Sequence, residues 1–337
     1  MKKFLILIFI LISVIAFSTT LPQLFESAMA SNTNLSLANL KLEQASMTYQ
    51  MNMIQASIPV VNQGEQIAAQ IAYISSLQSY QSSLKNYYFN IISTTFKVEI
   101  SKTNLEISQM KLEVATSNYA NILALFGKSL ISKISLQQAS VTVAEDKNNF
   151  KNAQWNYKFA ISNFQDVTGK KWKGITISVP NFSSIPASLT KWLNDDLSVK
   201  SARLALESAK HSLQIIPKNS SQYTIKTAKI AVQRAKLNLK NAILSSKNDY
   251  FSLMQKLRYD YNHLLDTKTS LEIAEKNLHF FTQAYRSNLI SKVVYLNQYE
   301  LPYLKAKNAY YGALEIYWDD LVSYTVANDL NPGDVLK

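Results

Sequence analysis

Apolar residues recur at every seventh position along two long stretches of the chain. Between Glu65 and Gly127 there is neither proline nor glycine. A repeat of seven places one narrow apolar seam along a helix, which is typical of coiled coils. The sequence therefore predicts seams in both halves of the chain, formed by Leu77, Leu84, Ile91, Val98, Leu105, Leu112, Leu257, Leu264, Leu271 and Leu278.

Proline and glycine fall at the ends of these stretches and divide the chain into helices. We predict an all-α fold of two long and four short helices, over 23–57, 65–129, 134–168, 190–216, 222–287 and 293–328. A 65-residue helix is about 100 Å long at a rise of ~1.5 Å per residue. Pro302 lies inside the last predicted helix, so we expect a local kink there.

The two halves of the chain repeat each other. The segment Ser129-Leu-Ile-Ser-Lys133 recurs as Asn288-Leu-Ile-Ser-Lys292, in each case between two helical stretches. From Leu105 to Leu130 the count is 25 residues, whereas from Leu271 to Leu289 it is 18. A difference of seven preserves the register of a coiled coil. The pattern indicates duplicated coiled-coil hairpins.

This repeat gives the expected domain organisation. It comprises a signal peptide (1–18), a first helical repeat (19–168), a linker (169–188), a second helical repeat (189–328) and a C-terminal tail (329–337). Lys2 and Lys3 precede an apolar run over 4–17 and small polar residues, the layout of a secretory leader. An uncleaved membrane anchor is the alternative, although 14 residues are few for a span that needs about 20.

Composition excludes several classes of site. The chain has no cysteine, which removes disulfides, thiolate metal sites and a lipid-modified cysteine. Its net charge of +12 comes from lysines scattered along helices, so we interpret them as solvated faces in preference to a nucleic-acid or lipid surface.

Residues with catalytic chemistry are not arranged as an active site. His211, His263 and His279 are far apart and lack the spacing of a metal pair. No phosphate-binding glycine loop or nucleophile elbow occurs. Asp146 and Asp320 lie near seam positions, where they could set helix register or accept hydrogen bonds from tyrosines. We therefore expect no enzyme activity, no cofactor and no metal.

These features resemble the TolC-type outer-membrane efflux protein family. Its members carry an internal duplication, an Asn-x-x-Leu-x-x-Ala motif followed by Leu-Glu-x-Ala near each repeat start, and a Gly-Leu-Ile/Val turn between long helices. The matching segments here are 32–45, 195–209, 129–133 and 288–292. The resemblance covers essentially the whole chain after the leader.

The resemblance implies a homotrimer, in which three chains form a hollow α-helical barrel in the periplasm of a two-membrane bacterium. It also implies transport by efflux or type I secretion, with docking to a periplasmic adaptor (membrane fusion) protein and an inner-membrane transporter. The implied docking tip consists of Leu130, Ile131, Ser132, Lys133, Leu289, Ile290, Ser291 and Lys292.

Two departures from the family qualify these expectations. The family has a membrane β-hairpin in each repeat, but the gaps at 58–64 and 217–221 are too short for two strands of about 9–11 residues. We therefore expect the β-barrel strands to be absent, and a separate outer-membrane pore becomes a conceivable partner. The family also often has acidic residues just after the second turn. In this chain the equivalent stretch, Val293-Val294-Tyr295-Leu296, is uncharged, and the nearest charged residues are Lys133 and Lys292. These lysines are either exposed turn residues or a basic mouth that attracts anions.

Two functions remain open at this point. The first is a conduit component of the TolC type, favoured by the repeat and its turns. The alternative is a coiled-coil spacer that holds the layers of the cell envelope apart and transports nothing, favoured by the short gaps and the missing lipid anchor.

Overall fold

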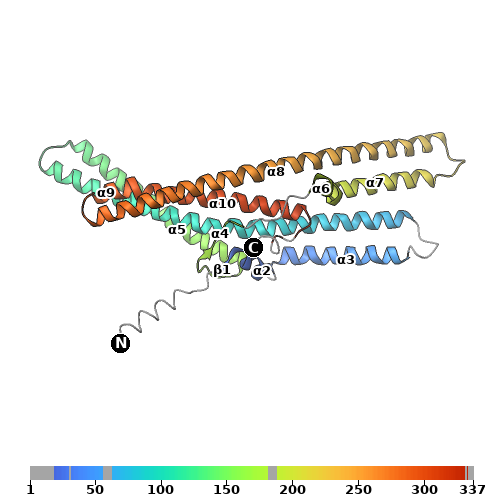
Figure 1. Cartoon of the computed structure of the whole chain (residues 1–337), viewed down its shortest axis with the longest axis horizontal. Coiled ribbons are helices and arrows are strands. Elements are labelled where there is room, and N and C mark those ends of the chain that lie inside the picture. The colour runs from blue at the N-terminus through green and yellow to red at the C-terminus, as the bar shows by residue number, and fades with distance from the viewer. Residues whose placement is uncertain (1–18, 30–31, 56–62, 181–187, 331, 333–337) are drawn as a thin grey trace, which may run out of the picture. The chain divides into compact units, whose positions relative to one another are not determined.

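The computed structural model describes residues 19–29, 32–55, 63–180, 188–330 and 332 of the 337-residue chain (Figure 1). This part of the chain is almost entirely helical, and its only strands are two pairs of residues. The predicted all-α fold is confirmed. The predicted leader over 1–18 and most of the gap at 58–64 lie outside the described residues.

The two halves of the chain present helices of similar length in the same order. In the first half these are α2 (Leu21–Met29), α3 (Thr33–Gln55), α4 (Gln63–Gly127) and α5 (Lys133–Thr168). In the second half they are α6 (Leu189–Asp195), α7 (Leu197–Gln214), α8 (Gln222–Arg286), α9 (Lys292–Tyr295), the π-helical turn η1 (Leu296–Glu300) and α10 (Leu301–Ala327). Helices α4 and α8 have 65 residues each.

Two of the predicted helices are interrupted. The helix predicted over 23–57 is divided into α2 and α3, and the Asn32 side chain accepts a hydrogen bond from the backbone of Leu35 (2.9 Å) at the start of α3. The helix predicted over 190–216 is divided at Asp196, whose backbone is non-helical and whose carboxylate caps Val199 N–H (2.8 Å). Asn and Asp compete with the helix through such local bonds, so these breaks are short and polar.

A small parallel pair of strands was not predicted. Strand β1 (Thr19–Thr20) pairs with β2 (Ile175–Thr176), with Thr19 opposite Ile175. Two residues are too few to show an alternating pattern, so periodicity could not reveal them. The other gap considered in the sequence, 217–221, lies in the connection between α7 and α8. It contains turns, and Ser220 N–H donates to the Pro217 carbonyl (3.0 Å).

The disturbance expected at Pro302 takes the form of a π-helical turn. Helix α10 begins at Leu301 and continues through Pro302, while the wider turn η1 lies directly before it. Proline has no N–H and its ring collides with the carbonyl four residues earlier in a regular helix. A π turn is one of the known ways to relieve such a conflict.

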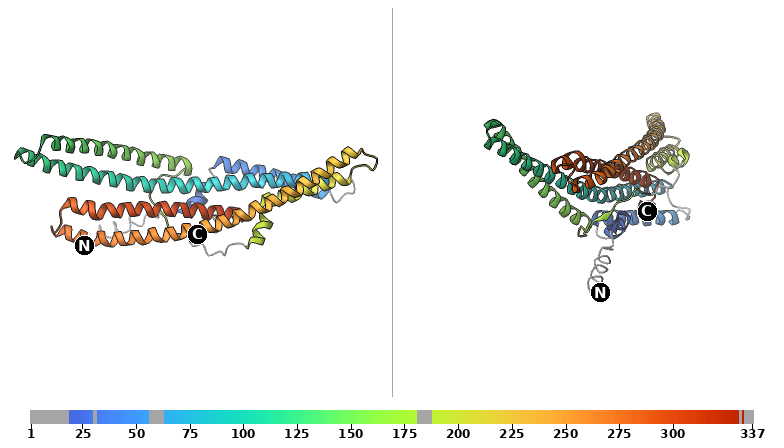
Figure 2. Two further views of the ribbon diagram at one scale, coloured as in Figure 1. Left: turned by 90° about the horizontal axis from the view of Figure 1, so that it is seen from above. Right: turned by 60° about the vertical axis from the view of Figure 1, so that its left-hand side comes forward.

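The described chain forms two compact units. Unit 1 contains Asn90–Val179, Tyr259–Trp318 and the chain up to Leu24, and unit 2 contains Phe25–Phe89, Pro180–Arg258 and the chain from Asp319. Within unit 1, α4 pairs with α5 and α8 pairs with α10 as two helical hairpins (Figures 1 and 2). Met110, Leu296 and Leu304 form a buried cluster between α4 and the α9–α10 segment.

Unit 2 is held by aromatic and polar contacts. Phe25 meets Tyr88 edge to face at 4.7 Å, and the Tyr87 hydroxyl donates to the Phe25 carbonyl. Burial raises the pKa of Tyr87, which favours its neutral, donating form. Elsewhere in this unit the Trp192 indole N–H donates to the Ser246 carbonyl (3.1 Å), and the buried Asp320 pairs with Lys256. Asp320, one of the two acids singled out in the sequence, thus has a cation as its partner.

The ten predicted seam residues all lie at buried or half-buried positions. Ile91, Val98 and Leu264 are fully buried, whereas Leu105 and Leu271 are only half-buried within a single chain. Among the described helices, none combines the length and the apolar character that crossing a bilayer requires.

Candidate functional site

The first tip, residues 128–133, joins α4 to α5 by a left-handed turn. Ser129 has φ 57°, and Leu130 N–H reverses the chain by donating to the Leu125 carbonyl (3.0 Å). Ser129 N–H donates to the Phe126 carbonyl (2.9 Å). This pair of bonds is the Schellman arrangement that satisfies the last carbonyls of a helix.

The second tip, residues 287–292, repeats this geometry. Asn288 has φ 59°, its N–H donates to the Tyr285 carbonyl (3.0 Å), and Leu289 N–H donates to the Ala284 carbonyl (2.9 Å). The next helix is capped in the same way in both tips, since Ser132 Oγ accepts from Ser135 N–H (3.1 Å) and Ser291 Oγ accepts from Val294 N–H (3.3 Å). The sequence similarity of the two turns therefore corresponds to one backbone structure made twice.

Both tips present a leucine to solvent. Leu130 is 69% exposed and Leu289 is 77% exposed. Ile131 and Ile290 are half-buried, and the flanking Ser132, Lys133, Ser291 and Lys292 are exposed. A single exposed leucine is ordinary on a protein surface. Two of them at the ends of equivalent hairpins form candidate contact points.

The second tip is tied to the side of α4. Lys292 Nζ forms an ion pair with Glu113, and this bond raises the pKa of the Lys292 ammonium. Glu113 lies 14 residues before Gly127, the last residue of α4. At a rise of ~1.5 Å per residue, the first tip therefore extends about 20 Å beyond the level of the second. The charge of Lys292 is therefore balanced locally by Glu113.

Aromatic side chains fix the base of the second tip. Tyr285 stacks on Tyr295 with ring centroids 4.8 Å apart, and Phe281 stacks on Tyr299 at 3.6 Å. The Tyr295 hydroxyl also lies 3.1 Å from Thr282 Oγ1. These contacts join the end of α8 to α9 and η1, so they fix the helices on both sides of the second tip.

Glu300, at the end of η1, lies in the same region of unit 1. Burial raises the pKa of its carboxyl from the ordinary 4.5, and the nearby carboxylates of Glu113 and Glu106 raise it further. Lys292 acts in the opposite direction. Glu113 and Glu300 thus both interact with Lys292 close to the second tip.

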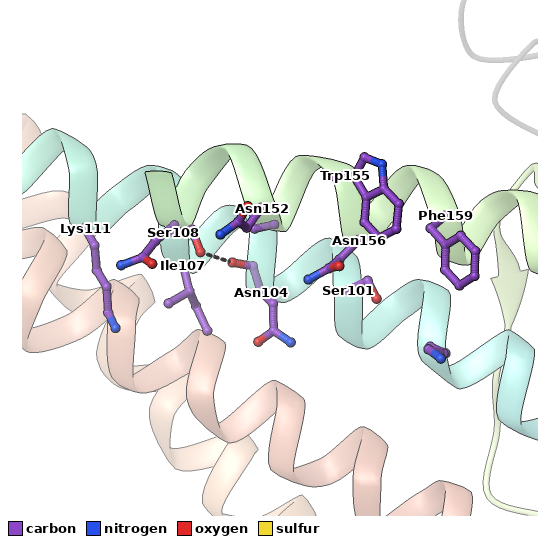
Figure 3. Close-up of a pocket in the computed structure, with 12 residues that line it drawn as sticks. Ser101, Asn104, Ile107, Ser108, Lys111, Asn152, Trp155, Asn156 and Phe159 are labelled. Carbon is purple, nitrogen blue, oxygen red and sulfur yellow. Dashed lines mark hydrogen bonds between the residues drawn. The ribbon is translucent and has the colours of Figure 1, made fainter. Parts of the chain in front are cut away.

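A polar groove of about 690 Å³ runs between α4 and α5 in unit 1 (Figure 3). Its walls carry amides, hydroxyls and lysines, with Trp155 and Phe159 stacked at one end (centroids 5.4 Å). Figure 3 shows Asn104, Asn152 and Asn156 around it, and Ser108 Oγ donates to the Asn104 carbonyl (2.8 Å). Such a surface is well hydrated and has no carboxylate in its lining.

No three histidine or carboxylate side chains gather into a metal-binding group in the described part of the chain. The described residues instead form exposed leucines at the tips, polar helix faces in contact with water, and apolar seams.

Sequence reasoning located the tips but missed their supports. Glu113 and Lys292 are far apart in the sequence, so no local pattern could pair them. Tyr285 was recognisable only as a packing residue at seam spacing, and Tyr295 only as a residue that follows the second turn. Their stacking depends on the turn between them.

Comparison with known proteins gives a clear structural result. No protein-family model and no curated protein matches the sequence. Among solved structures, the CmeC outer membrane channel of Campylobacter jejuni matches with 13% identity and a TM-score of 0.56, over 93% of this chain and 86% of CmeC. The MtrE outer membrane channel of Neisseria gonorrhoeae matches with 13% identity and a TM-score of 0.55, over 93% and 90%.

The outer membrane protein VceC of Vibrio cholerae matches with 12% identity and a TM-score of 0.53, over 91% of this chain and 94% of VceC. These identities are too low to transfer a function, but the matches span nearly the whole chain. The chain therefore has the fold of TolC-type outer-membrane channels, the family that its sequence resembles.

Proposed function

We propose that the chain is a TolC-like component of an efflux or secretion conduit. Three copies form a helical tube in the periplasm, and the tips dock a periplasmic adaptor protein and an inner-membrane transporter. The observation that carries this proposal is the fold, which matches outer-membrane channels over 91–93% of the chain. The solute crosses along the bore.

The surface chemistry of the helices supports a tube. A wall one helix thick needs apolar flanks, where neighbouring helices pack, and polar faces toward water on both sides. The half-buried seam residues and the amide-lined groove between α4 and α5 supply these two kinds of surface. A channel with amide and hydroxyl walls lets a polar solute exchange water for protein contacts at little cost.

The proposed location follows from the leader and the fold. We assign 1–18 to export, 19–168 and 189–328 to the two helical repeats, 169–188 to their linker and 329–337 to a C-terminal tail. The protein then stands at the outer membrane or in the periplasm of a two-membrane bacterium.

Deletion of the gene tests the transport function. The conduit predicts greater sensitivity to toxic compounds, restored by the wild-type chain. Unchanged sensitivity together with an altered spacing between the membranes would favour the spacer function and contradict the conduit.

Substitution at the first tip tests docking. Leu130 is exposed, so Leu130→Asp leaves folding intact but puts a charge at the proposed contact point. We expect Leu130→Asp to restore less than a tenth of the wild-type resistance, and the matched control Leu130→Met to restore it fully. Full resistance with both variants would exclude Leu130 from the docking surface.

A further inference from the structure

The chain between Glu207 and Asp249 contains eight basic residues and no acidic residue. This segment supplies eight of the net +12 charges of the chain. All eight side chains are exposed, and none of them forms an ion pair with a described residue. They are Lys210, Lys218, Lys226, Lys229, Arg234, Lys236, Lys240 and Lys247. Such an uncompensated basic segment attracts a polyanion.

The fold brings part of this charge together at one end of unit 2. Helix α7 ends at Gln214 and α8 begins at Gln222, so Lys218 lies in the connection between them. Lys226 and Lys229 lie in the first two turns of α8, within about 10 Å of its start. Helical side chains lean toward the N-terminus of their helix, so both lysines extend toward the α7–α8 connection.

Apolar side chains are exposed among these lysines. Ile215 is 61% exposed directly after α7, and Tyr223 is 81% exposed in the first turn of α8. Tyr223, Lys226 and Lys229 also line one hollow of about 460 Å³, together with Gln222 and Ile225. We call Ile215, Lys218, Tyr223, Lys226 and Lys229 the basic patch.

The other hairpin of unit 2 has no charge at the same end. No charged residue occurs between Glu43 and Glu65 in the sequence. Near the end of α3, Met51 is 60% exposed and Ile54 is 69% exposed. Helix α3 ends, and α4 begins, at the end of unit 2 where the basic patch lies (Figures 1 and 2). An uncharged helix end that exposes apolar side chains loses little hydration when it contacts lipid.

We propose that the basic patch binds the phosphate groups of an anionic lipid surface. The two ammonium groups of the hollow donate charge-assisted hydrogen bonds to phosphate oxygens. Tyrosine and isoleucine are suited to the boundary between headgroups and acyl chains, where Tyr223 and Ile215 lose their exposed apolar surface. Nucleic acid would neutralise the same lysines but would leave Ile215 in water, so a lipid surface fits the whole patch better.

Binding to lipid vesicles tests the charged part of the patch. We expect the wild-type chain to sediment with phosphatidylcholine vesicles that contain about one-third phosphatidylglycerol, and to be released at about 0.5 M NaCl. A lysine near such a surface contributes about fivefold to binding, so Lys226→Gln, Lys229→Gln should bind about 25-fold more weakly. The matched control Lys147→Gln, Lys151→Gln removes two exposed charges from α5 and should bind within about twofold of wild type.

A second pair of variants tests the apolar part. Ile215→Ser should weaken binding about tenfold, because the isoleucine no longer buries apolar surface among the headgroups. Ile134 on α5 is similarly exposed, at 66%, so Ile134→Ser is its matched control and should bind as wild type does. If the double lysine variant has a lower unfolding midpoint, Lys218→Gln in the α7–α8 connection replaces it, with an expected loss of about fivefold.

Four results would overturn the proposal. These are equal binding to vesicles of phosphatidylcholine alone, equal losses in a variant and its control, displacement by inorganic phosphate at constant ionic strength, and displacement by duplex DNA at an equal phosphate concentration. The third would indicate a site for a small anion, and the fourth a nucleic-acid surface. The wild-type and variant chains are exported and purified in parallel, so any contribution from the leader is common to all. The assay requires neither a trimer nor transport, so its outcome is independent of the proposed function.

Discussion

At the scale of single residues, burial within one chain varies sharply between neighbours. Leu264 is fully buried, whereas the adjacent Leu265 is 41% exposed. The seven-residue row predicted which of the two faces the seam. It could not predict the degree of burial, because Leu105 and Leu271 belong to the same rows and are only half-buried. Burial depends on the neighbouring helix, which a one-helix pattern does not contain.

Truncation of Leu264 should therefore be costly. We expect Leu264→Ala to lower the free energy of unfolding by about 2–5 kcal/mol, since it removes buried apolar surface and leaves a cavity. The control Leu265→Ala should cost less than about 1 kcal/mol. Chemical denaturation of both variants measures the difference, and equal losses would contradict the packing of α8.

The ionisation of Glu300 gives a prediction about pH. Its pKa is raised in the folded chain, so the folded state binds its proton more tightly than the unfolded state does. Stability then falls as pH rises above the ordinary pKa of 4.5. Glu300→Gln should raise the unfolding midpoint at pH 7, and the gain should shrink as the pH falls to 4. Thermal unfolding at both values checks this, and a gain that is the same at both would contradict it.

At the scale of elements, the positions of proline and glycine predicted the ends of the long helices well. The ends of α4, α5 and α8 lie within two residues of those predicted. The sequence pattern did not predict the interruptions at Asn32 and Asp196 or the turn η1. Each of them depends on a local hydrogen bond or a steric conflict inside an apolar pattern. The pairing of β1 with β2 joins segments far apart in the sequence, which local rules do not reach.

The left-handed residue of each tip makes a comparison possible. A non-glycine residue at positive φ is strained, but asparagine tolerates this region better than serine does. Ser129→Gly should therefore stabilise the chain by about 0.5–1 kcal/mol, and Asn288→Gly by less. Denaturation of the two variants under one condition gives the order, and a larger gain at Asn288 would contradict this account of the turns.

At the scale of the whole molecule, one chain leaves two rows of large apolar side chains exposed. In unit 2 these are Leu37, Leu40, Met47 and Met51 on α3 and Tyr223, Ile230, Leu237, Leu244 and Phe251 on α8. The sequence implied self-association only through its resemblance to a trimeric family. It did not separate the buried row of α8 from the exposed one, because both have the same period and only the fold distinguishes their directions.

A substitution within the exposed apolar row of α8 should change the proposed trimer. We expect the wild-type protein to have the mass of three chains by light scattering and Leu237→Asp to have the mass of one, because a charge at the contact must lose its hydration. Asn238→Asp introduces the same charge at the next residue, away from the seam, and should remain trimeric. A trimeric Leu237→Asp would contradict the position of the interface.

The unequal reach of the two tips has a mechanical consequence. If three chains close into a ring, the end of the ring has three protruding first tips, which alternate with three recesses at the second tips. A partner with three-fold symmetry could then bind in only one orientation about the axis. A rotation of about 60° would place its protruding parts against the first tips instead of in the recesses. The Lys292–Glu113 pair marks the level of each recess along α4.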